Sequence, residues 1–297
     1  MTRREKVLQR TRVGLTLALA VAGLLYASSL SFGAELTRWL AVALSLWCVF
    51  EVNRMGLFRH GMCALGACVT ILYAALFMGD SPFGSDTLNI SSRDIFWVAV
   101  VAAGAGLLVA APWAVFGSKR APESRHGEGL GPAPLPNFLV IPLLGLSLVF
   151  LYPLRLAGGA GALAAFVGLA KIGDIAGYYF GNLMGKSHPF PRLSPGKTTA
   201  GCVASLIAGT AVGALLASIG AFGDPRYGVL SGLAFGALVN VTAQAGDLLE
   251  SALKRRAGVK DSGTTFGPSG GMLDLVDSFF LAAPLAAFAG PLLFHWA

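Results

Sequence analysis

The sequence predicts an all-α integral membrane protein with about nine transmembrane helices. Of its 297 residues, 55% are hydrophobic and only 12% are charged, and the mean hydropathy is +0.69. These values lie outside the usual range of soluble proteins. A membrane-spanning helix needs about 20 mostly apolar residues, and the chain offers such runs repeatedly. We therefore expect one polytopic membrane protein rather than several soluble domains.

Polar segments and Gly/Pro positions divide the apolar sequence into spans. The expected spans cover residues 13–33, 38–53, 61–78, 95–117, 136–154, 159–180, 200–222, 228–250 and 271–294. The first follows a basic start, as in a signal peptide, but it is long for one and has no clear cleavage site, so we expect a retained helix. The Pro/Gly-rich segment 118–135 predicts a cytoplasmic connector. It separates N-terminal transmembrane helices (1–117) from a C-terminal region (136–297) that holds the unusual polar residues.

The basic residues indicate how the chain is oriented. With a cytoplasmic N-terminus, most of the 22 Lys and Arg residues fall on the cytoplasmic side. Those expected outside are Arg38, Arg93, Arg155 and Arg226. Membrane insertion imposes this distribution. It accounts for the net charge of +7, which therefore does not indicate nucleic-acid binding.

Ionisable residues inside a membrane span are costly and mark candidate functional positions. Asp174 lies in an apolar span three residues after Lys171, a spacing at which two side chains pair on one helical face; a structural ion pair is the alternative. The next loop contains the sequence SPGKTT from Ser194, in which glycine allows close backbone approach and Lys197 offers a charge to phosphate. A Walker A loop is excluded, because it needs glycine at the place of Pro191 and a preceding strand.

A second group of charges lies at the end of the eighth span. Asp247, Glu250, Ser251 and Lys254 are spaced by three or four residues and share one helical face. The two carboxylates are either paired with Lys254 and Arg255 or held to bind a hard cation. Oxygen ligands suit Mg²⁺, which bridges substrate phosphates.

The third group lies in the last cytoplasmic loop and at the start of the last span. It comprises Lys260, Asp261, Gly270, Gly271, Asp274 and Asp277. The two glycines lead into the helix, a junction whose free N–H groups favour anions. The last two acids can act as partners of the helix dipole, but their position in the apolar run argues for a further role.

All three groups reach the cytoplasmic side of the expected membrane. Acids that gather a divalent metal and bases that gather phosphate, in one pocket at the membrane edge, indicate phosphoryl or nucleotidyl transfer. The membrane location implies that one substrate is a lipid. The expected ligands of Mg²⁺, and of a second cation if there is one, are Asp247, Glu250, Asp274 and Asp277.

The spacing of these residues resembles the signature of phosphatidate cytidylyltransferases, also called CDP-diacylglycerol synthases. That signature reads S-x-x-K-R-x4-K-D-x-G, then G-G, then D-x-x-D. The matching residues are Ser251, Lys254, Arg255, Lys260, Asp261, Gly263, Gly270, Gly271, Asp274 and Asp277. The blocks GDLLES and SPGKT are also similar to neighbouring blocks of the family. The resemblance covers the chain from about residue 170 to 290.

The resemblance implies transfer of a cytidylyl group from CTP to phosphatidate, giving CDP-diacylglycerol and pyrophosphate in phospholipid biosynthesis. It implies an active site at the cytoplasmic edge of a bacterial inner membrane, among membrane lipids, and leaves a homodimer open. The implied catalytic residues are Asp247, Lys254, Asp261, Asp274 and Asp277. The implied substrate-binding residues are Asp174, Ser194, Lys197, Ser251, Arg255, Lys260, Gly270 and Gly271.

Three positions depart from the family pattern. Ser269 stands where the family has histidine, Leu275 where it has arginine, and Ala200 where it commonly has an acid. Two polar donors that can contact phosphate are thereby lost. The alternatives are a related CTP-dependent enzyme or kinase acting on another lipid, a catalytically impaired homologue and, from a different class, a transporter or inactive scaffold.

Overall fold

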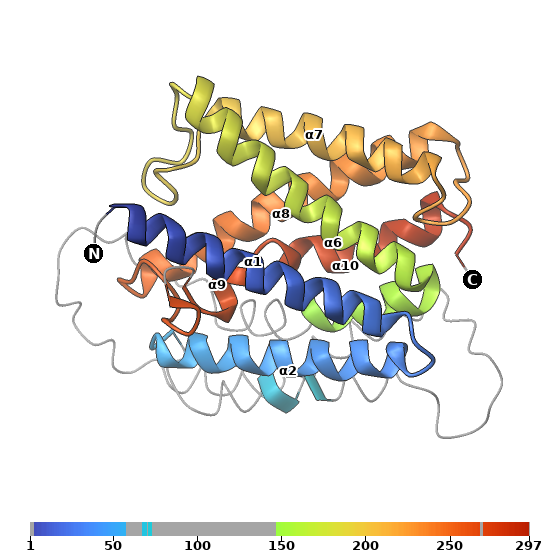
Figure 1. Ribbon diagram of the computed structural model, residues 1–297, viewed down its shortest axis with the longest axis horizontal. Coiled ribbons are helices and arrows are strands. Elements are labelled where there is room, and N and C mark those ends of the chain that lie inside the picture. The colour runs from blue at the N-terminus through green and yellow to red at the C-terminus, as the bar shows by residue number, and fades with distance from the viewer. Residues whose placement is uncertain (1–2, 58–66, 70, 73–146, 268–269, 297) are drawn as a thin grey trace, which may run out of the picture.

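The computed structural model in Figure 1 describes residues 3–57, 67–69, 71–72, 147–267 and 270–296. Within these ranges every regular element is a helix, and the one strand-like contact is an isolated bridge between Pro225 and Phe294. The all-helical class expected from the sequence is therefore confirmed. The expected connector at 118–135 and the span at 95–117 lie outside the described residues, as do most of the span at 61–78 and part of that at 136–154.

The described helices vary widely in length. They are α1 (Arg3–Ser28), α2 (Gly33–Arg54), the 3-10 helix η1 (Leu148–Phe150), α6 (Leu151–Met184), α7 (Thr199–Ser218), α8 (Val229–Arg256), α9 (Met272–Val276) and α10 (Phe279–Leu293). Five segments are long and apolar enough to cross a membrane: Gly33–Arg54, Leu148–Met184, Thr199–Ser218, Val229–Arg256 and Met272–Leu293. The described chain therefore has the composition of a polytopic membrane protein.

The long helix α6 consists of two helical segments joined at Gly159. The backbone of this residue (φ 78°, ψ 176°) is not helical, and such a positive φ is readily adopted by glycine. The bend coincides with the turn expected between the spans 136–154 and 159–180. Next to it, Arg155 donates hydrogen bonds of 2.9 and 2.7 Å to the carbonyl oxygen of Ser28 and so ties the bend to the end of α1.

Small residues bring α7 very close to its neighbours. A Cβ atom added at Gly213 of α7 would lie 2.6 Å from the Cα atom of Gly236 on α8, and one added at Gly201 would lie 2.6 Å from the carbonyl oxygen of Gly177 on α6. Close backbone approach of this kind is typical of helix packing in membranes. It brings the ends of α6, α7 and α8 together around one cavity.

The helices run back and forth along the longest axis of the molecule (Figure 1). The start of α1 and the loops at 185–198 and 257–267 lie at one end, whereas the loop at 219–228 and the end of the described chain lie at the other. The three groups of charges expected to form a site therefore gather at a single end of the bundle.

Candidate active site

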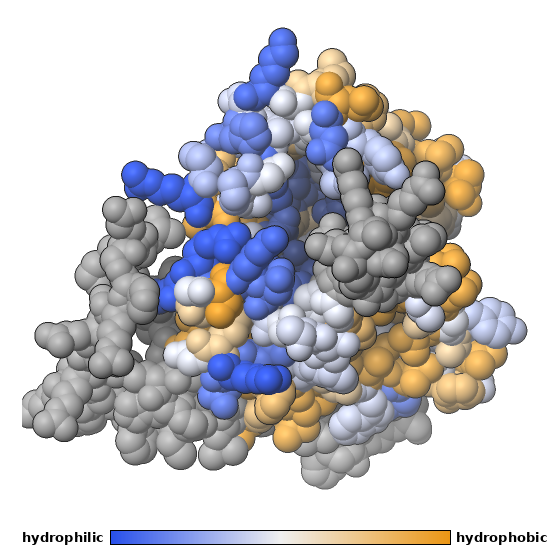
Figure 2. Space-filling view, turned by 60° about the vertical axis from the view of Figure 1, so that its left-hand side comes forward, coloured by the Kyte–Doolittle hydropathy of each residue, from blue (hydrophilic) through white to orange (hydrophobic). Residues whose placement is uncertain are grey.

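A cavity of about 320 Å³ opens at the end of the molecule that carries the loops 185–198 and 257–267. Its lining residues of the Asp, Glu, Lys and Arg types are Lys171, Asp174, Lys197, Asp247, Asp274 and Asp277. Figure 2, which turns this end toward the viewer, shows hydrophilic side chains gathered there between hydrophobic flanks. The structure thus brings together residues from all three expected groups.

Three carboxylates converge beside this cavity. Asp247 and Glu250 on α8 and Asp277 at the end of α9 each offer one oxygen atom, and these atoms lie within 4.8 Å of one another. The close approach of α8 to the end of α9 depends on Gly246, because a Cβ atom at this position would lie 2.5 Å from the carbonyl oxygen of Asp277. The geometry therefore unites three of the four expected metal ligands.

Glu250 makes this acidic group suitable for a cation. Its side chain is 0% exposed and its Oε1 atom has no hydrogen-bond partner among the described residues. Its counter-charge is Lys254, whose Nζ atom lies 2.5 Å from Oε2. A buried carboxylate oxygen without a donor is costly, and a divalent cation shared with Asp247 and Asp277 would satisfy it. The residues present therefore fit Mg²⁺, which prefers oxygen ligands.

Asp274, the fourth expected metal ligand, has a different position. Its Oδ1 atom accepts a hydrogen bond of 2.6 Å from Lys254. Its Oδ2 atom accepts from the backbone N–H groups of Ser262 and Gly271, both at 2.8 Å, and lies 2.7 Å from the Ser262 hydroxyl oxygen. These donors leave little acceptor capacity for a metal. The contacts of Asp274 connect Ser262 and Gly271 to Lys254 of α8, and its predicted role as a metal ligand stays a prediction.

Glu51 of α2 is a site residue that the sequence analysis missed. Its side chain is 3% exposed. Oε1 accepts from the N–H of Met272 at 2.8 Å, and Oε2 accepts from the N–H of Leu273 at 2.9 Å and from the Ser262 hydroxyl at 2.8 Å. The sequence signal that could have identified Glu51 is its position as an acid inside the apolar span expected at 38–53, because acids are rare inside membrane spans.

The glycine pair before α9 does not offer the free N–H groups that we expected to bind an anion. The N–H of Gly271 donates to Asp274, and the next two N–H groups donate to Glu51. A Cβ atom at Gly271 would lie 2.4 Å from Glu51 Oε2, and one at Gly270 would lie 2.3 Å from Asp274 Oδ2. The glycines therefore make room for two protein carboxylates, which occupy the expected anion position.

The expected basic residues divide into those inside and those outside the cavity. Lys197 lines it, with Nζ 2.7 Å from Asp247 Oδ2 and 3.3 Å from the carbonyl oxygen of Gln244. Lys254 bridges Glu250 and Asp274. Arg255 instead donates to the backbone carbonyl oxygens of two loop residues, at 3.3 and 3.2 Å. Its contacts therefore hold loops in place.

The remaining expected residues lie around the site in different ways. Asp174 lines the cavity and forms the expected pair with Lys171, at 3.5 Å. Lys260 and Asp261 are exposed on the loop, Ser251 is buried on α8, and neither they nor Ser194 are among the lining residues of the cavity.

The three departures from the family pattern have separate surroundings. The Leu275 side chain packs against the hydrophobic core. Ala200 lines an apolar groove of about 590 Å³ formed by α6 and α7. Ser269 lies outside the described residues.

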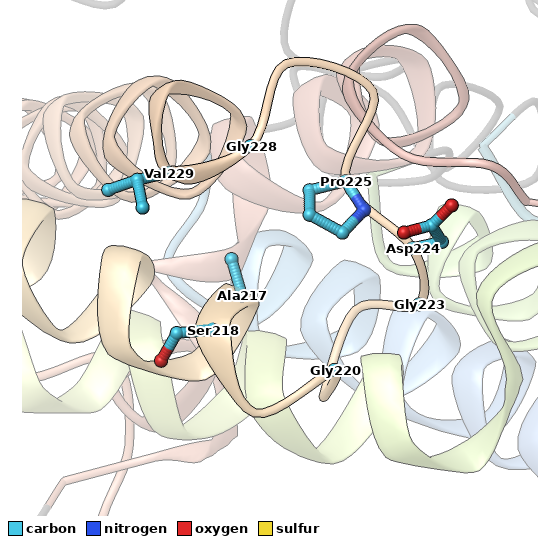
Figure 3. A pocket seen from close by; sticks show the side chains of 8 residues that line it. All are labelled: Ala217, Ser218, Gly220, Gly223, Asp224, Pro225, Gly228 and Val229. Atoms are coloured by element: carbon cyan, nitrogen blue, oxygen red, sulfur yellow. The ribbon is translucent and has the colours of Figure 1, made fainter.

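A second cavity, of about 540 Å³, lies at the opposite end of the bundle, around the loop at 219–228 (Figure 3). Its lining consists of small residues with Pro225 and Val229, and its ionisable lining residue is Asp224. Its lining contains a single acid and no Lys or Arg, so it offers neither a cluster of acids for a metal nor a base for phosphate. The charged cavity is therefore the candidate site.

The fold and the charged cavity define a polytopic helical membrane protein with acids and lysines gathered at one end of its helices. The model of the cytidylyltransferase family matches residues 1–292. The chain belongs to the cytidylyltransferase family.

Several curated proteins are similar to part of the chain. The phosphatidate cytidylyltransferase of Staphylococcus saprophyticus is 37% identical over 145 residues, which are 49% of this chain and 54% of that protein. The phosphatidate cytidylyltransferase of Staphylococcus haemolyticus is 35% identical over 142 residues, 48% and 53% of the two chains. The uncharacterized protein YnbB of Escherichia coli is 34% identical over 142 residues, 46% and 45% of the two chains. The chain thus spans about half the length of the curated relatives it matches.

Proposed function

We propose that this protein transfers the cytidylyl group of CTP to phosphatidate and releases pyrophosphate, and so produces CDP-diacylglycerol for phospholipid biosynthesis. The observation that carries the proposal is the meeting of Asp247, Glu250 and Asp277 beside the cavity that Lys197 lines. Membership of the cytidylyltransferase family supports nucleotidyl transfer. The names of the staphylococcal relatives support phosphatidate as the acceptor.

In the proposed reaction an oxygen of the phosphatidate phosphate attacks the α-phosphorus of CTP. A new P–O bond forms, the bond from that phosphorus to the oxygen bridging to the β-phosphate breaks, and pyrophosphate leaves. No covalent intermediate with the protein is needed. The protein acts mainly by holding the two phosphates in line and by neutralising charge.

Asp247, Glu250 and Asp277 are the proposed ligands of Mg²⁺. When bound, the ion supplies positive charge that stabilises the phosphates and the leaving pyrophosphate. A second cation remains a prediction. Lys197 is the proposed phosphate-binding base, because it lines the cavity and lies beside Asp247.

Lys254 and Asp274 have a positioning role in this proposal. Lys254 lies between Glu250 and Asp274 at 2.5 and 2.6 Å, so it fixes both carboxylates rather than a substrate. Direct roles for Asp261 and Lys260, which are exposed on the loop, and for Ser194, Ser251 and Asp174 in substrate binding remain predictions.

The proposed setting is the bacterial inner membrane, with nine spans and a cytoplasmic N-terminus. The start of α1 lies at the same end of the bundle as the charged cavity, so this orientation would give CTP access from the cytoplasm and the lipid access from the bilayer. We also propose the division into 1–117, 118–135 and 136–297. Glu51 would then connect the N-terminal helices to the catalytic region. No observation on the described residues supports a homodimer, which remains a prediction.

The test is incubation of the purified protein with radiolabelled CTP, Mg²⁺ and phosphatidate in mixed micelles. We expect a lipid-soluble labelled product and one pyrophosphate for each product molecule. The Asp277→Asn variant is the negative control. If the wild-type protein neither releases pyrophosphate nor is stabilised against heat by CTP and Mg²⁺, the enzyme proposal is wrong and the transporter or scaffold alternative is favoured.

A related reaction on another lipid phosphate is the second candidate. It is favoured by Leu275 and Ala200, which provide no polar group where the family pattern has one. Parallel assays with phosphatidate, an ether-lipid phosphate and an isoprenoid phosphate would identify the acceptor. Release of CDP instead of pyrophosphate would identify a kinase, and binding without turnover would identify an impaired homologue.

A further inference from the structure

Lys171 lines the charged cavity but is not among the residues that act in the proposed reaction. It lies on α6, within the segment long and apolar enough to span the membrane. Its side chain is 37% exposed and lines the cavity together with Asp174, Asp247, Asp274 and Asp277. A lysine at such a depth is costly unless it has a partner or a function.

The contacts of Lys171 hold its ammonium group at the cavity wall. The Nζ atom donates to the Ser278 hydroxyl at 2.8 Å and to the carbonyl oxygen of Leu275 at 3.2 Å, and it lies 5.1 Å from the centre of the Phe279 ring. These groups carry no net charge. The carboxylate paired with it is that of Asp174, at 3.5 Å and i,i+3 along the helix. The cation is thus well oriented, and its ion pair with Asp174 is long and part-exposed.

The contact between Lys171 and Leu275 lies at one of the positions where the chain departs from the family pattern. The family pattern has an arginine at position 275, whereas the Leu275 side chain of this chain packs against the core. Lys171 brings a cation to the backbone of that same residue from a different helix. A cation from α6 therefore contacts the backbone at position 275 and lines the cavity.

We propose that Lys171 binds a phosphate group of a substrate and takes over the charge of the missing arginine. This inference rests on the proposed cytidylyl transfer. Lysine binds phosphate as a point charge with three donors, and this one faces the cavity that also contains Lys197. The phosphate belongs either to CTP or to the lipid, two sources with the same chemistry, which the experiment separates.

The test compares Lys171→Gln with Lys171→Arg in the mixed-micelle assay, with CTP and phosphatidate varied in turn. A hydrogen bond to a charged group contributes about 1.5–3 kcal/mol, so we expect Lys171→Gln to raise one KM by about 10- to 100-fold. A raised KM for CTP assigns the contact to the nucleotide, and a raised KM for phosphatidate assigns it to the lipid. Lys171→Arg should stay within a few fold of wild type.

Two further variants test whether Lys171 binds phosphate in place of the missing arginine. Lys186→Gln, at an exposed lysine in the loop at the same end of the molecule, should leave both KM values unchanged. The double variant Lys171→Gln with Leu275→Arg restores a cation at the family position and should recover part of the lost affinity. If neither this variant nor Lys171→Arg binds better than Lys171→Gln, the inference is wrong.

A binding measurement keeps this inference separate from the proposed reaction. If wild-type protein forms no product, the proposed function fails. The role of Lys171 is then tested by measuring the unfolding temperature with CTP and Mg²⁺, and separately with phosphatidate micelles. Phosphatidylcholine micelles are the control for the lipid. Phosphate binding by Lys171 is supported if CTP, or phosphatidate but not phosphatidylcholine, raises the unfolding temperature of wild type and not that of Lys171→Gln. Equal shifts for both proteins, or no shift for either, overturn it. A Lys171→Gln protein that aggregates is replaced by Lys171→Met in the same comparison.

Discussion

Glu51 and Ser262 are 211 residues apart in the sequence and are joined by a hydrogen bond of 2.8 Å. The Ser262 hydroxyl also lies 2.7 Å from Asp274 Oδ2. One hydroxyl proton can serve only one of these two carboxylates at a time, and each carboxylate also accepts backbone N–H groups of the segment that leads into α9. The junction is therefore organised around two acids, the buried Glu51 from α2 and the part-buried Asp274 from α9 itself.

Replacing Glu51 should destabilise this junction. Glu51→Ala leaves the N–H groups of Met272 and Leu273 without acceptors, and each unsatisfied buried donor costs about 1–3 kcal/mol. We expect a clear fall in the unfolding temperature in detergent and a milder fall for Glu51→Gln, which keeps one acceptor oxygen. Glu35→Gln is the matched control, because Glu35 lies on the same helix with its side chain 47% exposed, so that water can replace its contact with the part-buried Arg38. Equal unfolding temperatures for Glu51→Ala and Glu35→Gln would refute the role of Glu51.

The positions of most helices could be predicted from apolar runs, whereas the loop contacts could not. The spans expected at 200–222 and 228–250 correspond to α7 (Thr199–Ser218) and α8 (Val229–Arg256), because hydrophobicity over about 20 residues is a local property. The ending of α8 was misjudged by six residues, since its last turns carry the charged residues Lys254, Arg255 and Arg256 and so resemble a loop.

The site residues that share one face of a helix could be predicted from their spacing in the sequence. Asp247 and Glu250 share a face of α8, and they meet Asp277 as part of the expected acidic group. The fate of the glycine pair was not predictable, because Glu51 arrives from a segment more than 200 residues away. A sequence shows which N–H groups a helix start leaves free, but not which distant carboxylate accepts from them.

The acidic group should control the response to magnesium. Asp247→Asn and Asp277→Asn each remove a proposed ligand, so the loss of apparent Mg²⁺ affinity should exceed the roughly 10- to 100-fold that loss of an outer-shell partner costs. Titrating Mg²⁺ in the CTP assay, and measuring Mn²⁺ binding directly, checks this. An unchanged metal dependence in both variants would contradict the assignment.

Asp274 should behave differently from these ligands. Asp274→Asn weakens the contacts with Lys254, Ser262 and Gly271, and breaking a buried charge pair is strongly destabilising. We expect lower activity together with a lower unfolding temperature, and Mn²⁺ binding in the fraction that remains folded. Loss of Mn²⁺ binding with an unchanged unfolding temperature would instead make Asp274 a metal ligand.

Gly246 should be sensitive to a methyl group, unlike a helical glycine that has open space beside it. A Cβ atom there would lie 2.5 Å from the carbonyl oxygen of Asp277, so Gly246→Ala must push α8 away from the end of α9, and overpacking of this kind costs about 1–3 kcal/mol. Gly168 of α6 is the matched control, because a Cβ atom at that position has nothing within 4 Å and Ala is favoured over Gly in a helix by about 1 kcal/mol. We expect Gly246→Ala to weaken Mn²⁺ binding as well as stability, since Asp247 and Asp277 move apart, and Gly168→Ala to preserve both. Wild-type metal affinity in Gly246→Ala would mean that the three carboxylates do not act as one group.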